Sequence, residues 1–505
     1  MSGKRRTRGA IVSRASGGQA RADGTVFFKR GLLGLLTTLA LAGCAVGPEY
    51  QRPGIEVGET YKQVDGWVSA AAAPAELPAD WWRLFDDAEL SSLMRELAQS
   101  NQDIRRAEAQ YRQARALVSG ARSGLFPTVD VDAGTTRSGA GNASGNGGAG
   151  SQHNLGASVS WEVDVWGRVR RSVESSEGEA QASAADLAAT RLSMQSALAQ
   201  AYFRLRSADA ERRFLAQTVS AFERTLEITR HRLDAGLVSQ ADVASAQSQL
   251  ENARVQWMAV ARERAQYEHA IAVLLGRAPS AFGLAETAVS VAVPAVPRAL
   301  PSTLLLRRPD VVAAERRVAA ANAQIGAAQA AWFPSLTLNA QGGYRSGEWA
   351  HWLSAPFSYW SLGPMLAQAI FDGGARQANI EQARAGYEAQ AASYRQTVLD
   401  ALREVEDYLA QSHGLNQEQE VQARALQAAR ESLRLYTNQF EAGMIDYLSV
   451  AQVETNALAA ERSALALARD RLLASVQLIT ALGGGWQGMD AELSETAQGP
   501  SGDAS

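Results

Sequence analysis

The stretch LGASVSWEVDV, residues 155–165, decides the fold of this 505-residue chain. Leucine, alanine, valine and tryptophan occupy its odd positions, whereas glycine, serine, Glu162 and Asp164 occupy its even positions. Because successive side chains of a strand point to opposite faces, this alternation predicts a strand with one apolar and one polar face. Strands of about ten such residues between turn-rich loops are typical of outer-membrane barrels. An amphipathic sheet packed on helices is the alternative interpretation.

Three further segments carry weaker forms of this pattern. Apolar and polar residues alternate in 335–341, and two valines alternate with two aspartates in 129–132. The segment 359–371 is ambiguous, because both of its faces carry apolar residues. Aromatic residues gather toward the segment ends, as in the interfacial girdles of membrane barrels. They are Trp161, Tyr344, Trp349, Trp352, Tyr359 and Trp360.

The chain contains a tandem duplication of a unit of about 207 residues. Three dipeptides recur at this offset, and Trp166-Gly167 answers Asp372-Gly373 at an offset of 206. The near-constant spacing of four landmarks indicates two copies of one supersecondary unit. The three recurring pairs are Phe126-Pro127 with Phe333-Pro334, Ala235-Gly236 with Ala442-Gly443, and Leu275-Gly276 with Leu482-Gly483.

Each copy follows one plan of helix, two strands and long helix. Amphipathic stretches at 90–123 and 311–331 end at the Phe-Pro pairs, because proline stops a helix. After the strands, patterns rich in helix-forming residues run over 168–275 and 374–482, each interrupted by one glycine. A continuous helix over 168–235 would span roughly 100 Å, which predicts coiled-coil packing rather than a compact core.

Two strands per copy give four strands per chain, and four strands cannot close a membrane barrel. Known barrels begin at about eight strands, and an open edge in lipid would leave backbone groups unsatisfied. The strands must therefore be shared between chains. The predicted fold class is mostly α with a transmembrane β part, in which a tandem-duplicated protomer gives four strands to a common barrel above long helices.

The N-terminal region has the features of an export signal followed by a lipid attachment site. Two basic residues precede an apolar stretch, and Leu41-Ala42-Gly43 lies directly before Cys44, the only cysteine of the chain. This order predicts cleavage after Gly43 and acylation of the Cys44 thiol. Ala45, in place of aspartate, implies delivery to the outer membrane, where several acyl chains would anchor the protein firmly.

Charge and side-chain inventory exclude several functional classes. Removing residues 1–43, with eight basic residues and one acidic residue, leaves 41 basic and 52 acidic residues, a net charge of −11. So acidic a protein lacks the basic footprint of nucleic-acid binding. The five histidines include no i, i+4 pair, and neither a P-loop nor a Gly-x-Ser-x-Gly motif occurs. We expect no enzyme activity, no metal and no cofactor except the covalent lipid at Cys44.

Together these features resemble the TolC-like outer-membrane factors of tripartite efflux pumps, in the lipoprotein branch often called NodT-type. The resemblance spans residues 44 to about 486. It implies a homotrimer whose twelve strands form one β-barrel on top of a long α-helical periplasmic barrel. It also implies two protein partners, a periplasmic adaptor (membrane fusion) protein and an inner-membrane RND-type pump. The matching motifs are CAVGPEYQRP (44–53), LLLRRPD (304–310), AERR (314–317), WFPSL (332–336), IFDGG (370–374) and ALGGGW (481–486).

The same resemblance places a periplasmic gate at the helix turns. Gly236 and Gly443 would mark the turns and the contact with the adaptor. Within 446–452, which would line the constriction, Leu448 takes the hydrophobic ring position. Tyr447 and Ser449 lie on either side of it in the sequence.

Two gate positions depart from the family pattern. Gln452 falls where well-known relatives carry an acidic ring residue, which weakens a carboxylate gate. Asp242 matches an acidic latch position, but its usual tyrosine partner is here Phe440, which has no hydroxyl. Ordinary helix-turn chemistry is the alternative role for all of these residues.

The function implied is a passive duct for small toxic compounds or drugs, located in the outer membrane and extending into the periplasm. The channel of a type I protein secretion system and a non-conducting structural lipoprotein are the alternatives. We expect translation to begin near Val26, which would place residues 1–25 outside the protein. The expected divisions are 1–43, signal peptide; 44–85, lipidated segment and belt; 86–276, first repeat; 277–300, linker; 301–483, second repeat; and 484–505, tail.

Overall fold

The computed structural model describes residues 45–55, 77–139, 149–287, 293–294, 308–350, 353–486 and 488. The predicted signal peptide and the acylated Cys44 lie outside these residues. The chain divides into two compact units. One unit, here the strand unit, includes Thr128–Arg168 and Ala330–Ala369, and the other, the helical unit, contains Gly47–Pro127, Val169–Gln329 and the remainder from Ile370.

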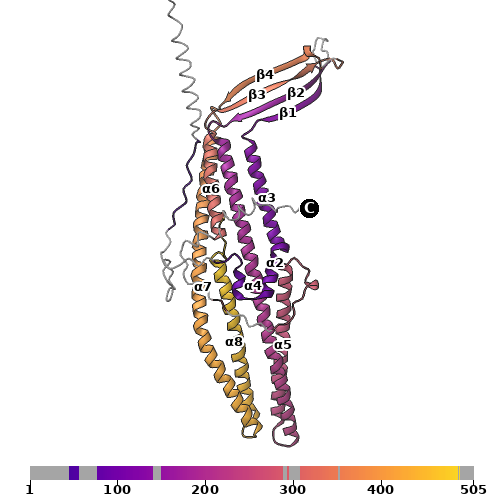
Figure 1. The fold of residues 1–505 in the computed structure, drawn as a ribbon, viewed down its shortest axis with the longest axis vertical. Helices are drawn as coiled ribbons and strands as arrows, with labels where there is room; N and C mark the ends of the chain where they lie inside the picture. Colours follow the sequence, from indigo (N-terminus) through magenta and orange to yellow (C-terminus); the bar gives the residue numbers. More distant parts are fainter. Residues whose placement is uncertain are drawn as a thin grey trace, which may run out of the picture. The chain divides into compact units, whose positions relative to one another are not determined.

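The strand unit is a four-stranded antiparallel sheet (Figure 1). Its strands are β1 (Thr128–Gly139), β2 (Ala149–Val163), β3 (Ser335–Ser346) and β4 (Ser358–Ala367), in the order β1-β2-β3-β4. A short 3-10 turn, η4 (Ala355–Phe357), precedes β4. Each repeat contributes one hairpin, and the repeats meet where β2 pairs with β3.

The apolar faces predicted for 155–165, 335–341 and 129–132 lie on one side of the sheet, because the register is uninterrupted. One face carries mostly apolar side chains, and several of them are well exposed in the single chain, namely Val129, Val131, Trp360, Leu362 and Leu366. The ambiguous segment 359–371 is a strand only up to Ala367. Its partner strand begins at Ser335, which pairs with Ala367, so later residues have no neighbour in β3.

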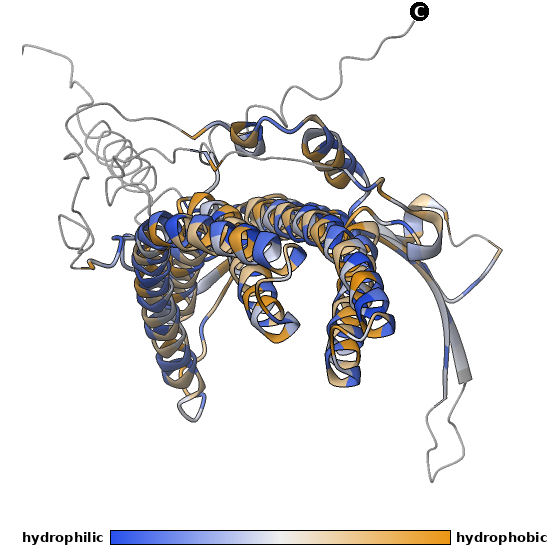
Figure 2. Cartoon of the chain, turned by 90° about the horizontal axis from the view of Figure 1, so that it is seen from below, coloured by the Kyte–Doolittle hydropathy of each residue, from blue (hydrophilic) through white to orange (hydrophobic). Residues whose placement is uncertain are grey.

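The helical unit is dominated by two pairs of long helices (Figure 1). The pairs are α4 (Arg168–Asp234) with α5 (Gln240–Leu274), and α7 (Ala375–Glu441) with α8 (Tyr447–Ala481). Both α4 and α7 have 67 residues, about 100 Å at the usual rise of 1.5 Å per residue. Hydrophilic and hydrophobic residues mix along these helices (Figure 2). Among the described helices, none has the length and apolar character that crossing a membrane demands.

The helix predicted over 90–123 is broken into α2 (Ala88–Ser100) and α3 (Gln102–Ser123). Asn101 between them has an extended backbone, and its side-chain oxygen accepts a hydrogen bond from the Ile104 amide at 2.9 Å. Its side-chain nitrogen donates to the Leu274 carbonyl of α5 at 2.7 Å. The break exists because Asn101 both caps α3 and satisfies a carbonyl at the end of α5. The second repeat has one helix here, α6 (Pro309–Ala330).

Alanine and glycine allow the helices to approach closely. A side chain at Gly178 of α4 would lie 3.0 Å from the Cβ of Ala320 in α6. One large core contains the buried rings of Trp81, Tyr202 and Tyr394. A second, smaller core lies where the helix pairs turn.

The described N-terminal segment is bound along the helical unit. Arg171, a buried arginine of α4, forms an ion pair with Glu49 at 3.0 Å. Asn322 of α6 donates to the Pro48 carbonyl at 2.9 Å. Gly47 lies so close to the backbone of α6 that a side chain there would collide with it. Residues 47–49 are therefore held in one place on the helices.

Candidate gate at the helix turns

The two helix turns have the same backbone geometry. Gly236 and Gly443 adopt left-handed φ angles of 71° and 74°, a conformation that strongly favours glycine. The following amides, of Leu237 and Met444, donate back to the carbonyls of Arg232 and Gln439 at 2.8 and 2.9 Å. This hydrogen-bond pattern is the Schellman motif, which ends a helix and reverses the chain. The turn positions predicted from the interrupting glycines are thus the positions observed.

The second helix of each turn begins with a serine and an aspartate three positions apart. Their order is reversed between the repeats. In α5, Ser239 is the N-cap and Asp242 accepts from its backbone amide at 2.8 Å, which completes a capping box. In α8, Asp446 is the N-cap and accepts from the Ser449 amide at 3.0 Å and its hydroxyl at 2.6 Å. Hydrogen bonds from Ser449 lower the pKa of Asp446. The observed contacts of Asp242 and Ser449 are therefore helix-start chemistry.

Aromatic residues pack in the smaller core beside the two helix turns, a region that we call the tip. The rings of Phe440 and Tyr447 lie 5.9 Å apart, and both side chains are buried. Tyr447 is only 1% exposed, so it packs inside the tip and does not face a passing solute. Burial, and then the nearby charge of Glu454, raise the pKa of Tyr447, which keeps its hydroxyl protonated.

Arg232 at the end of α4 contacts Phe440 in two ways. Its guanidinium lies 4.2 Å from the ring centroid and donates to the Phe440 carbonyl at 2.8 Å. This contact links the two helix pairs, where the family pattern predicted a latch between Asp242 and position 440. The position equivalent to Arg232 in the second repeat is Gln439, so the repeats differ here in charge. This difference is the signal in the sequence that Arg232 has a contact of its own.

Leu448 and Gln452 lie on one exposed stripe of α8. Leu448 is 67% exposed, and Gln452, one helical turn later, is also exposed. The Gln452 side chain donates to Asn456 at 3.3 Å, one further turn along the same stripe. The structure therefore brings Leu448 and Gln452 together and places Tyr447 on the opposite, buried side.

Glu454 is a buried carboxyl that the sequence analysis missed. It is 8% exposed, and its Oε2 atom has no hydrogen-bond partner among the described residues. Burial raises its pKa to about 7. The signal in the sequence is its position, because Tyr447, Val450, Ala451 and Ala457 are the buried residues on the same helical face.

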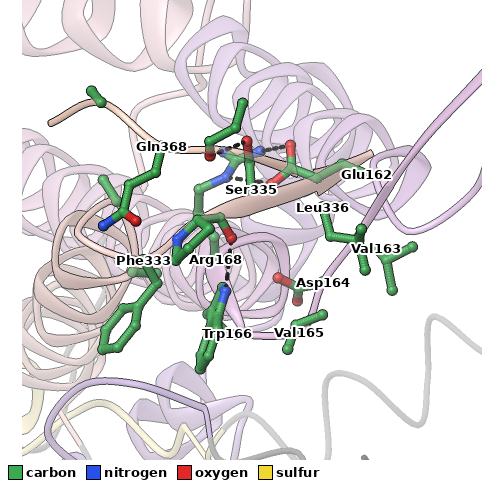
Figure 3. Close-up of a pocket in the computed structure, with 15 residues that line it drawn as sticks. Glu162, Val163, Asp164, Val165, Trp166, Arg168, Phe333, Ser335, Leu336 and Gln368 are labelled. Atoms are coloured by element: carbon green, nitrogen blue, oxygen red, sulfur yellow. Dashed lines mark hydrogen bonds and ion pairs between the residues drawn. The ribbon is translucent and has the colours of Figure 1, made fainter. Parts of the chain in front are cut away.

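A hollow of about 440 Å³ lies within the strand unit, where the strands end (Figure 3). Trp166 stacks on Phe333 with ring centroids 4.6 Å apart, and its indole N–H donates to the Pro334 carbonyl at 2.9 Å. Glu162 accepts two hydrogen bonds from Arg168, at 2.9 and 2.6 Å. These contacts join the Phe-Pro turn of the second repeat to the first repeat, so we assign the hollow a structural role.

No group of three or more histidine, cysteine, aspartate or glutamate side chains in the described residues could hold a metal ion. The candidate functional residues described above lie at the helix turns and on the faces of the strands.

Comparison with known proteins bears on both repeats. The family model "Outer membrane efflux protein" matches residues 93–277 and 300–484. The toluene efflux pump outer membrane protein TtgF of Pseudomonas putida is 31% identical over 474 residues, which cover 91% of this chain and 98% of TtgF. The cation efflux system protein CusC of Escherichia coli is 30% identical over 461 residues, which cover 90% of this chain and 99% of CusC.

A solved structure of the outer-membrane channel OprN aligns with a TM-score of 0.81 at 29% identity, covering 88% of this chain and 100% of that chain. Both repeats, and nearly the whole length of these relatives, are therefore matched. The chain belongs to the outer membrane efflux protein family and is an outer-membrane transport protein, not an enzyme.

Proposed function

We propose that three copies of this chain form one channel, with twelve strands in a single barrel. The observation that carries this proposal is the open four-stranded sheet, whose edge strands β1 and β4 lack a second neighbour among the described residues. Its apolar face is exposed in the single chain, which suits contact with lipid. Pairing β4 of one copy with β1 of the next would satisfy both edges and close the sheet.

In this proposal the helix turns form the periplasmic gate. The exposed stripe of Leu448 and Gln452 would face the narrowest part of the duct, and the buried Tyr447 would support it from behind. Gly236 and Gly443, with the exposed side chains of Leu237 and Met444 beside them, would meet a periplasmic adaptor protein. An inner-membrane RND-type pump would supply the energy, so the channel itself conducts passively.

The cargo would be small toxic compounds. Relatives of this chain are named for toluene efflux, antibiotic efflux and cation efflux. These names span apolar and charged solutes, which suits a duct whose partners select the cargo. We further propose that acylation of Cys44 anchors the chain in the outer membrane.

The experiment is conductance of the purified oligomer in planar lipid bilayers. The native channel should pass little current, and Leu448→Ser combined with Gln452→Ala should raise it, because both changes remove bulk from the exposed stripe. Cysteines introduced at facing positions of β1 and β4 should crosslink chains into trimers and no larger ring. Purified trimers without current in either form would overturn the channel, and a different crosslinked ladder would overturn the trimer.

A further inference from the structure

The polar face of the sheet carries an uneven set of charges. Of the described residues in its four strands, the charged side chains on this face are Asp130, Asp132, Glu162 and Arg345. Glu162 is neutralised by its two hydrogen bonds with Arg168. Two carboxylates therefore stand against one guanidinium, and if this face lines the barrel, each copy adds one net negative charge to the lumen.

One row of residues crosses all four strands on this face. Asp132 pairs with Gly156, Gly156 with Gly343, and Gly343 with Tyr359. The two central positions of the row lack side chains, so the residues at its two ends can reach across the sheet. In the adjacent row Asn154 pairs with Arg345, and its side chain donates to the carboxylate of Asp132 at 2.6 Å.

Tyr359 lies flat across this row. A Cβ atom at Gly156 would be 2.9 Å from the Tyr359 hydroxyl and 2.8 Å from Oδ1 of Asp132. Neighbouring strands are about 4.8 Å apart, so the ring of Tyr359 spans β3 to reach β2. At Gly343 a Cβ would collide with the Leu155 carbonyl oxygen, so the ring passes over a position that accepts only glycine.

Arg345 contacts the tyrosine. Its guanidinium lies 4.8 Å from the centroid of the Tyr359 ring, a distance typical of cation–π contact. Arg345 and Asp132 are both exposed, so both charges can act on an ion that passes this face. A ring that projected into the lumen from each copy would narrow the bore, and the glycines remove this obstruction.

We propose that the row Asp132–Gly156–Gly343–Tyr359, with Arg345, makes the barrel favour cations over anions and keeps its bore free of the Tyr359 rings. This inference rests on the proposed trimeric channel, in which the row would recur three times around one lumen. Carboxylates lining a pore raise the local concentration of cations, and the effect is strongest at low ionic strength.

The first test measures the K⁺ to Cl⁻ permeability ratio from reversal potentials in a KCl gradient across a planar bilayer. It is run in the native channel and in the Leu448→Ser, Gln452→Ala background, so that the tip does not limit the current. Asp132→Asn should lower the ratio about threefold at low salt, because three charges disappear at short range from the ion path. Arg345→Gln should raise the ratio by a similar factor.

Arg137→Gln is the matched control for Arg345→Gln, because it removes one positive charge from the opposite face of the sheet. It should leave the ratio unchanged. Changes of opposite sign for Asp132→Asn and Arg345→Gln cannot arise from general loosening of the barrel. If both variants leave the ratio at the native value, or if Arg137→Gln moves it as far, the charge selection is wrong.

The second test concerns size. Gly156→Ala should push the Tyr359 ring away from the sheet and lower the conductance, and adding Tyr359→Ser to this variant should restore it. Equal conductance of Gly156→Ala and the native channel would overturn the role of the glycines in keeping the bore free, as would a double variant no better than the single one. Should Gly156→Ala fail to form trimers on native gels, Asp132→Asn and Arg345→Gln still decide the proposal. Native trimers that conduct in neither background would instead overturn the proposed function itself.

Discussion

Asp209 shows at the scale of single residues how the helical unit accommodates a buried charge. Its carboxylate is fully buried and accepts from Arg206 at 2.8 Å and from Arg264 at 2.6 Å. The same two arginines donate to the carbonyls of Ala285 and Leu284. Buried charges persist where oppositely charged partners accompany them, so this cluster fastens the segment after α5 to the long helices.

Glu454 is the contrasting case, because nothing among the described residues compensates its Oε2 atom. Burial raises its pKa from the ordinary 4.5 to about 7, so folding favours the protonated form. The resulting stabilisation is complete below pH 4.5 and is lost as the pH rises through 7. Over that range it amounts to on the order of 3 kcal/mol.

We therefore expect the tip to loosen between pH 5.5 and pH 8. Hydrogen exchange of α8, corrected for the intrinsic rate, should accelerate over this interval in the native protein. Glu454→Gln should exchange slowly at both pH values, because it cannot ionise. The exposed Glu227→Gln in α4 is the control and should keep the native pH dependence. A native tip that exchanges equally at both pH values would contradict this account.

At the scale of elements, the junction of α2 and α3 depends on one side chain. Replacing Asn101 by alanine removes the α3 cap and leaves the Leu274 carbonyl without its donor. Loss of a cap and of a buried hydrogen bond together should destabilise the helical unit by about 2 kcal/mol. Urea denaturation followed by circular dichroism measures this change. Gln110→Ala, an exposed substitution in α3, should shift the midpoint little, and an equal shift in both would show that Asn101 has no special role.

Several elements follow from the sequence because their causes are local. The period of two in 155–165 predicts β2 and its faces, and the duplication locates the partners in the second repeat. Glycines at 236 and 443 stop the helices through their own backbone preference. The Ser239–Asp242 capping box is also a local pattern, because its two residues lie three positions apart.

The remaining elements depend on contacts between distant segments. The break at Asn101 exists because the end of α5 lies beside it, and no propensity reveals that neighbour. The contact of Arg232 with Phe440 joins residues 208 positions apart. The burial of Tyr447 beside the exposed Leu448 is an intermediate case. Its spacing with Val450, Ala451 and Glu454 marks a buried helical face, although the family resemblance groups Tyr447 with the gate.

At the scale of the whole molecule, a single chain exposes more apolar surface than is usual for a soluble monomer. Phe371 is 90% exposed, and most of the apolar side chains of β4 are exposed as well. Large exposed apolar patches normally mark association sites or membrane contact. Both would be covered in the proposed trimer within the outer membrane.

Attachment of the chain to lipid is tested by Cys44→Ala. The variant should incorporate no labelled palmitate, and a larger share of it should remain outside the outer-membrane fraction, because barrel and acyl chains anchor together. Cys44→Ser gives the smallest change in shape and should behave in the same way. Palmitate incorporation by either variant would contradict the assignment of Cys44.

The bound N-terminal segment would define where the membrane surface lies on the protein. Only Ala45 and Val46 separate Cys44 from Gly47, which is held against α6. Three residue steps reach at most about 10 Å, so the acyl chains would enter the leaflet within that distance of Gly47. Because this linker is so short, the lipid anchor would fix the distance between the helices and the bilayer. If a flexible insert before Gly47 lengthens this linker, the lipid anchor should no longer fix the depth of the channel in the membrane.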